Sequence, residues 1–250
     1  MSDVSDDFYI GYEERAPRGL GRFVRARVVL FCAVAAALAG AFAASQERFA
    51  PSRFEFGVER SFEGRLEHLP YPVLAIERPG RDAGESRWLL TRFGKFDASN
   101  VTSALDGHRV RVSGQLIHRG TATMLEIDPV TLEDFGMAYP PPPPPLGEPV
   151  TLTGEIVDAK CHLGVMKPGD LKPHRACAAR CISGGVPAAL VVRDSIGRAT
   201  YYLLADEEGR PVGPALLDRI AEPVEVTGRV RAHGDLLVLV ASAEAFMRVD

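Results

Sequence analysis

Residues 106–128 read DGHRVRVSGQLIHRGTATMLEID. Apolar and polar residues alternate on both sides of a short turn, which is the period of a β-strand with one buried face. Two such strands joined by a short glycine-containing turn form a β-hairpin. The segment therefore predicts antiparallel β-structure.

The same pattern returns at residues 222–246, EPVEVTGRVRAHGDLLVLVASAEAF. Both segments contain a V-x-V-[ST]-G strand, a short turn and a second apolar strand. Upstream, SFEGRL at 61–66 corresponds to TLTGEI at 151–156. Further strand-like segments follow in each half, namely PVLAIERPG and SRWLLTRFG in the first and PAALVVRDSIGRATYYLLAD in the second. The chain therefore contains two copies of one fold.

Each half resembles the OB-fold, a five-stranded Greek-key barrel, in the order of its elements. That order is three strands, a short helix and two more strands, and GPALLDRIA at 213–221 supplies the helix of the second half. An SH3-like barrel is the alternative for each half. We predict a mainly β protein: two tandem small OB-like antiparallel barrels, at 54–136 and 150–250, preceded by one transmembrane helix.

A proline-rich segment separates the two halves. Residues 139–149 read YPPPPPPLGEP, and successive prolines favour an extended polyproline helix that acts as a semi-rigid spacer. We assign residues 137–149 to a linker.

The N-terminal region predicts a membrane anchor. Residues 28–44 contain no charge, which is just long enough for a spanning helix, and we place the anchor at 28–46. Arginines precede this run, so residues 1–27 are predicted to form a cytoplasmic tail and the barrels to be exported, to the periplasmic side of a bacterial inner membrane. The alternative is a signal peptide, because AFA at 41–43 resembles a cleavage site.

The second half carries an insertion at 158–186, which includes CHLGVMKPGDLKPHRACAARCISGG at 161–185. The first half has no such insertion, so the barrel does not need the insertion for its core. Functional residues tend to lie on insertions of this kind. We predict a helix from about Pro173 to Ile182, ended by Gly184 and Gly185.

Soft metal ligands are concentrated in this insertion. On the predicted helix His174, Cys177 and Cys181 point to one side, and Cys161 ends the first strand of this half. A Cys3His set of this spacing suits zinc. His162 and Met166 are weaker candidates, and thiolate, imidazole and thioether ligands also suit copper. An iron–sulfur cluster could use the same cysteine and histidine donors.

The Cys-x3-Cys spacing resembles the copper-handling loops of periplasmic electron-transfer and copper-chaperone proteins. That resemblance implies copper as the bound metal. Those loops place a histidine after the second cysteine, whereas here none follows Cys181 before His233.

Two other uses of the cysteines stay open. Exported cysteines usually pair, so a disulfide from Cys161 to Cys177 or Cys181 would staple the insertion to the barrel. A thiol oxidoreductase is the second, with Cys177 activated by His174 and Arg175.

The combination of anchor, export and soft ligands points to a non-enzymatic role. We expect a metal- or cofactor-binding accessory or assembly subunit of a membrane redox complex, whose partners are the other subunits of that complex. The anchor-plus-barrel plan resembles, in layout only, the haem chaperones of cytochrome maturation. A net charge of −4 argues against a nucleic-acid partner.

Overall fold

The computed structural model of the chain describes residues 18–46, 52–78, 84–139 and 142–249. The first 17 residues of the predicted cytoplasmic tail, and residues 140–141 of the predicted linker, lie outside this range. The chain divides into two compact units, Met1–Phe49 and Ala50–Asp250.

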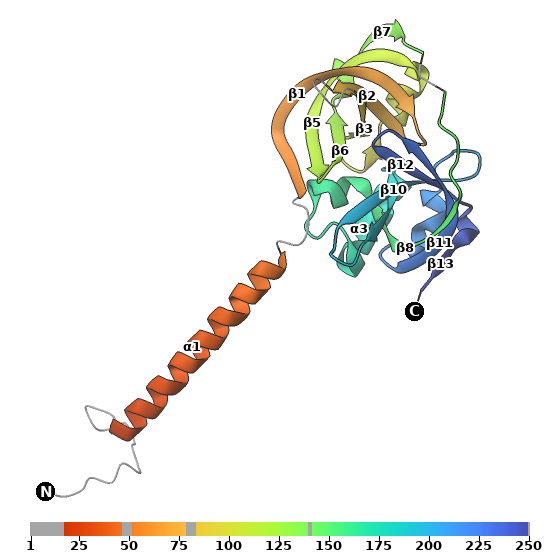
Figure 1. Ribbon diagram of the computed structural model, residues 1–250. Helices are drawn as coiled ribbons and strands as arrows, with labels where there is room; N and C mark the ends of the chain where they lie inside the picture. Colours follow the sequence, from red (N-terminus) through yellow and green to blue (C-terminus); the bar gives the residue numbers. More distant parts are fainter. Residues whose placement is uncertain (1–17, 47–51, 79–83, 140–141, 250) are drawn as a thin grey trace, which may run out of the picture. The chain divides into compact units, whose positions relative to one another are not determined.

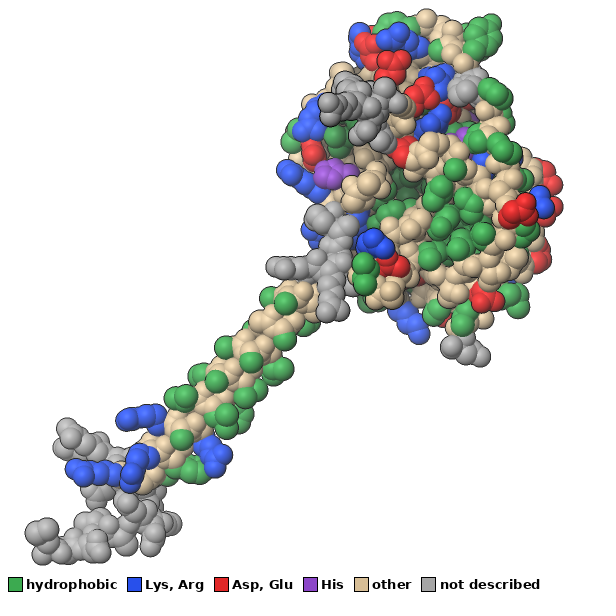
Figure 2. Space-filling view, in the orientation of Figure 1, with side chains coloured by type: hydrophobic (Ala, Val, Ile, Leu, Met, Phe, Trp, Pro, Cys, Tyr) green, Lys and Arg blue, Asp and Glu red, His purple; other side chains and the backbone are tan. Residues whose placement is uncertain are grey.

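The first unit contains one helix, α1 (Arg18–Gln46), which is long and apolar enough to cross a membrane. It begins at Arg18, ten residues before the uncharged run that starts at Val28. Apolar side chains cover α1 along its length, and the basic ones gather at its N-terminal part (Figure 2). These basic residues are Arg18, Arg22, Arg25 and Arg27.

The second unit begins with a closed five-stranded barrel (Figure 1). Its strands are β1 (Ser52–His68), β2 (Pro72–Arg78), β3 (Gly84–Arg92), β5 (His108–Arg119) and β6 (Ala122–Ile127). Neighbours pair in the order β1-β2-β3-β6-β5, and β5 closes on β1; the β3–β6 contact is parallel and the others are antiparallel. The short elements are β4 (Phe96–Asp97), α2 (Ser99–Thr102), η1 (Ser103–Leu105), η2 (Pro129–Thr131) and β7 (Glu133–Met137).

A second closed barrel repeats this connectivity. Its strands are β8 (Pro149–Asp158), β9 (Ala188–Arg193), β10 (Ala199–Ala205), β11 (Pro223–His233) and β12 (Leu236–Val240), and β10 pairs with β12 in parallel. The predicted helix before the last hairpin is the 3-10 segment η4 (Gly213–Arg219), and η5 (Ala243–Ala245) and β13 (Phe246–Arg248) end the chain. The prediction of two barrels is confirmed.

Two glycines at equivalent positions show the same close backbone approach in both barrels. A Cβ atom on Gly64 would lie 2.5 Å from the carbonyl oxygen of Ala75, and one on Gly154 would lie 2.5 Å from that of Val191. Side chains are excluded at both positions because the neighbouring strand passes too close. The sequence match between SFEGRL and TLTGEI therefore marks the same point in each barrel.

The insertion occupies one loop of the second barrel. Residues 69–71 connect β1 to β2, whereas residues 159–187 connect β8 to β9. The longer loop contains η3 (Cys161–Val165), a short helical segment interrupted at Gly164, and α3 (Leu171–Ser183).

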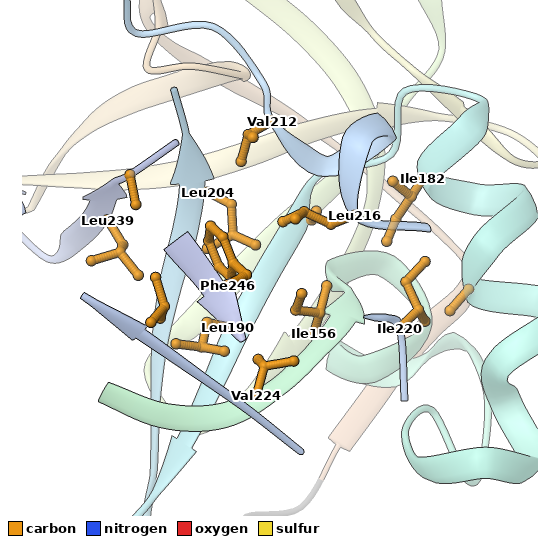
Figure 3. Packing of buried hydrophobic residues seen from close by; sticks show 14 of the residues in the cluster. Ile156, Ile182, Leu190, Leu204, Val212, Leu216, Ile220, Val224, Leu239 and Phe246 are labelled. Atoms are coloured by element: carbon orange, nitrogen blue, oxygen red, sulfur yellow. The ribbon is translucent and has the colours of Figure 1, made fainter. Parts of the chain in front are cut away.

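Helix α3 packs against the apolar core of the second barrel. Its Ala178 and Ile182 belong to the apolar cluster that fills this barrel, together with Ile156, Leu204 and Phe246. Figure 3 shows Ile182 in this cluster, next to Leu216. Burial of Ile182 contributes about 2 kcal/mol, which helps to fix the helix on the barrel.

The barrels also share an apolar cluster with each other. The first barrel supplies Tyr71, Val73, Leu89, Ile117 and Met124; the second supplies Val157, Ala159, Leu163, Ala189, Val191, Leu203, Ala205 and Val238. The hydroxyl of Tyr71 accepts a hydrogen bond from the backbone N–H of Ala188 at 3.1 Å, and burial raises the pKa of this tyrosine to about 12. The two barrels are therefore packed into one body.

A buried lysine crosses the contact between the barrels. Lys160, only 3% exposed, donates to the carbonyl oxygens of Arg92 and Gly94, each at 2.7 Å, and forms an ion pair with Glu126. All three partners belong to the first barrel, while Lys160 belongs to the insertion. Because a buried ammonium must be neutralised and fully hydrogen-bonded, it specifies how the insertion meets the first barrel.

We expect Lys160→Met to lower the free energy of unfolding by about 3–5 kcal/mol, because Glu126 would remain as an unpaired buried carboxylate. Glu126→Gln should be costly for the converse reason. The double variant should lose less than the sum of the two single losses. Urea unfolding of the four proteins measures this coupling, and strictly additive losses would contradict it.

Candidate metal-binding site

Three thiols meet where the insertion contacts the first barrel. Cys161 comes from η3, and Cys177 and Cys181 come from α3. Their three sulfur atoms all lie within 4.8 Å of one another, and the Sγ atoms of Cys161 and Cys181 are 4.0 Å apart. All four cysteines of the chain, Cys32 included, are free thiols in the structure.

Local backbone contacts position the two ends of this cluster. The backbone N–H of Cys161 donates to Oδ1 of Asp158 at 2.8 Å, which turns the chain at the end of β8. At the other end, Gly184 donates to the carbonyl oxygens of Arg180 and Cys181 and ends α3. Gly185 follows with a φ of +92°, a conformation that favours glycine.

Gly184 also makes room for the first barrel. A Cβ atom here would lie 1.9 Å from the carbonyl oxygen of Lys95, in the turn between β3 and β4. The backbone N–H of Asp97, in the same region, donates to the carbonyl oxygen of Gly184 at 3.3 Å. The sequence predicts Gly184 only as the end of the helix. Its second role, the close contact with the first barrel, depends on residues that are distant in the chain.

A buried carboxylate–imidazole pair adjoins the thiols. Nε2 of His174 donates to Oδ2 of Asp158 at 2.9 Å, and this hydrogen bond raises the pKa of His174. Donor atoms of Asp158, Cys161 and His174 lie within 4.8 Å of one another, so Cys161 is common to both groups. Carboxylates that orient histidines in this way are typical of metal sites.

Lys95 brings a positive charge from the other barrel. Its ammonium donates to Sγ of Cys177 at 2.8 Å and to Sγ of Cys181 at 3.4 Å. The bond to Cys177 raises the pKa of Lys95. A hydrogen bond from Cys161, with the help of Lys95, lowers the pKa of Cys181, while the same bond and burial raise the pKa of Cys161.

The two weaker candidates occupy other surroundings. His162 is fully buried, with Nε2 3.2 Å from Nη1 of Arg119 and its ring 5.6 Å from that of Tyr201, beside a cavity of about 200 Å³ between the barrels. Since the guanidinium can only donate, Nε2 of His162 must accept, and the ring is neutral. Burial, reinforced by Arg119, lowers the pKa of His162 to about 3. Met166, just after η3, is 44% exposed.

Asp158 and Lys95 are the two site residues that sequence reasoning missed. Asp158 stands three residues before Cys161, at the boundary of the predicted insertion, so a search for carboxylates near the histidine could have found it. Lys95 is 66 residues from Cys161 in a segment without soft ligands. Only the docking of the barrels reveals it.

These side chains could hold a metal ion. Tetrahedral coordination with metal–sulfur bonds of about 2.3 Å places two sulfur ligands about 3.8 Å apart. The separation of 4.0 Å between the Cys161 and Cys181 sulfurs is close to that value. Zinc and copper both accept thiolate and imidazole ligands.

A scan against protein-family models finds no match to this chain, and neither does a search of curated proteins.

The neutral, buried ring of His162 predicts loss of stability in acid. The unfolded state takes up a proton near pH 6.5, while the folded protein does not do so until about pH 3. The contribution of His162 to the free energy of unfolding is therefore fully present above pH 6.5. It declines as the pH falls toward 3, by at most ~1.4 kcal/mol per pH unit. In metal-free protein, His162→Gln should flatten the dependence of the urea midpoint on pH over this range. An unchanged slope would show that the ring is protonated in the folded state.

Proposed function

We propose that the protein is a membrane-anchored metal-binding subunit, exported to the periplasmic side of a bacterial inner membrane, that serves a membrane redox complex in an accessory or assembly role. The anchor is α1, whose apolar surface suits lipid. Its arginines lie in its first ten residues, so by the positive-inside rule this end stays in the cytoplasm. The second unit then lies outside.

We assign both barrels to the OB-like class. In support, each has the strand order first-second-third-fifth-fourth, closes on the first strand, and has a short helical segment between the third and fourth strands. In such a scaffold the loops vary while the barrel is kept. The second barrel uses its first loop for the cysteine-containing insertion.

The observation that carries the proposal is the convergence of three sulfur atoms within 4.8 Å of one another. Cys161, Cys177 and Cys181 would be the thiolate ligands, and His174, held by Asp158, would complete the set. A bound zinc or copper ion would supply soft-ligand coordination and, for copper, one-electron chemistry. An iron–sulfur cluster is less well suited, because it spreads its cysteines over several irons, whereas these sulfurs converge on one point.

The proposed partners are other subunits of the membrane complex. A protein held in the membrane by one helix, with soft ligands on the exported side, suits delivery or retention of a metal for a neighbouring membrane protein. The support for the redox assignment is this combination of anchor, export and ligand chemistry.

We expect full-length protein in detergent to bind one equivalent of zinc or Cu(I), with Cys161→Ser, Cys177→Ser and Cys181→Ser each losing affinity by at least on the order of 100-fold, because each removes a thiolate ligand. Asp158→Asn should cost about 10- to 100-fold through misorientation of His174. Cys32→Ser, which changes the cysteine of α1, is the matched control and should bind as the wild type does. Elemental analysis after dialysis measures the stoichiometry, and absorption separates coloured copper from colourless zinc.

Substoichiometric metal in wild type and variants alike would end the metal proposal. A disulfide-stapled interaction module would then be favoured, and thiol counting in denaturant without reductant identifies it. Four reactive thiols indicate metal ligands or reduced cysteines, whereas two indicate a bridge within the insertion.

The proposed orientation has its own test. Protease added to intact spheroplasts should digest the second unit and leave a membrane-protected N-terminal fragment. Digestion only after lysis would place the barrels in the cytoplasm and contradict the assignment.

A further inference from the structure

The amine of Lys95 lies in reach of two sulfur atoms in a manner that metal binding does not require. Nζ is 2.8 Å from Sγ of Cys177 and 3.4 Å from Sγ of Cys181. Lys95 and Cys177 are half-buried, whereas Cys161 and Cys181 are buried. A small oxidant from solvent therefore meets Cys177 first, at the sulfur that is closest to the amine.

Backbone contacts hold both partners in place independently of their own hydrogen bond. On one side of Lys95, the carbonyl oxygens of Arg92 and Gly94 are bound by the buried ammonium of Lys160. The backbone of Lys95 itself packs against Gly184 at the end of α3, the helix that carries Cys177. Reacting groups fixed about 3 Å apart react as if at very high local concentration.

We propose that Lys95 and Cys177 are the site of an oxidative N–O–S crosslink between the two barrels. The oxidant is hydrogen peroxide. One peroxide converts the Cys177 thiol to a sulfenic acid and water; a second removes the two hydrogens released as the sulfenic oxygen bonds to the Lys95 nitrogen. In sum, R–NH3+ + R′–SH + 2 H2O2 gives R–NH–O–S–R′ + 3 H2O + H+, and the proton of the Lys95 ammonium passes to solvent. Two equivalents of a dithiol return the amine, the thiol and one water.

The link would act as a covalent lock at an otherwise noncovalent contact. It joins the turn between β3 and β4 to α3, and it removes Cys177 from the group of three thiols. The reaction belongs to the metal-free thiols, so it goes beyond the metal site proposed above, and its test on metal-free protein can succeed or fail whether or not that site can bind metal.

The test is peptide mapping of full-length, metal-free protein in detergent after mild treatment with hydrogen peroxide. We expect one crosslinked peptide pair that contains Lys95 and Cys177, heavier than the two unmodified peptides together by about 14 Da, the mass of one oxygen less two hydrogens. Dithiothreitol should return both peptides to their unmodified masses. Cys32→Ser should give the same pair in the same yield.

Lys95→Arg keeps the positive charge but lacks the reacting amine, and it should abolish the pair. So should Cys177→Ser. If either variant fails to fold, fragmentation spectra of the wild-type pair still locate both linked atoms. A pair that persists in folded Lys95→Arg would overturn the assignment.

Two wild-type results would also overturn it. One is a mass loss of about 2 Da, which denotes a disulfide among the three thiols or, in a pair of the Lys95 and Cys177 peptides, a direct N–S bond without oxygen. The other is the addition of oxygen to Cys177 without any crosslink to Lys95.

Discussion

The rest of the second unit depends on how its two barrels are docked, and one buried cation fixes that arrangement. The ammonium of Lys160 has its charge balanced by Glu126 and donates to two carbonyl oxygens, that of Arg92 at the end of β3 and that of Gly94 in the β3–β4 turn. The apolar packing around Lys160 buries surface area, but it does little to fix the orientation of one barrel on the other, because hydrophobic contact is nondirectional. The ion pair supplies the direction: a displaced barrel would leave a charge buried without a partner.

Docking in this position is what completes the thiol site. The turn that binds Lys160 also carries Lys95. The contact that aligns the barrels therefore also places the ammonium of Lys95 beside Cys177 and Cys181. Asp158 serves both ends of the arrangement, through the backbone of Cys161 and the imidazole of His174. The group of donors therefore belongs to the contact between the barrels as much as to the insertion.

The repeat explains how such a site could be built without loss of the scaffold. Both barrels keep the same strand order and the same close backbone approach at Gly64 and Gly154. The loop after the first strand is much longer in the second barrel, and its helix α3 adds apolar side chains to a barrel that already has a core. Ligands on an insertion of this kind can change while the strands remain constrained by their own packing.

The sequence by itself determined the local features: the apolar N-terminal helix, the two β-repeats, the helix of the insertion and the presence of Cys161, His174, Cys177 and Cys181 in that one insertion. Each follows from periodicity, spacing or chain proximity. Lys95, the second role of Gly184 and the separate surroundings of His162 were decided only by tertiary structure. The physical reason is that each depends on a partner in the other barrel. The sequence pattern of a single segment does not indicate which distant part of the chain will pack against it.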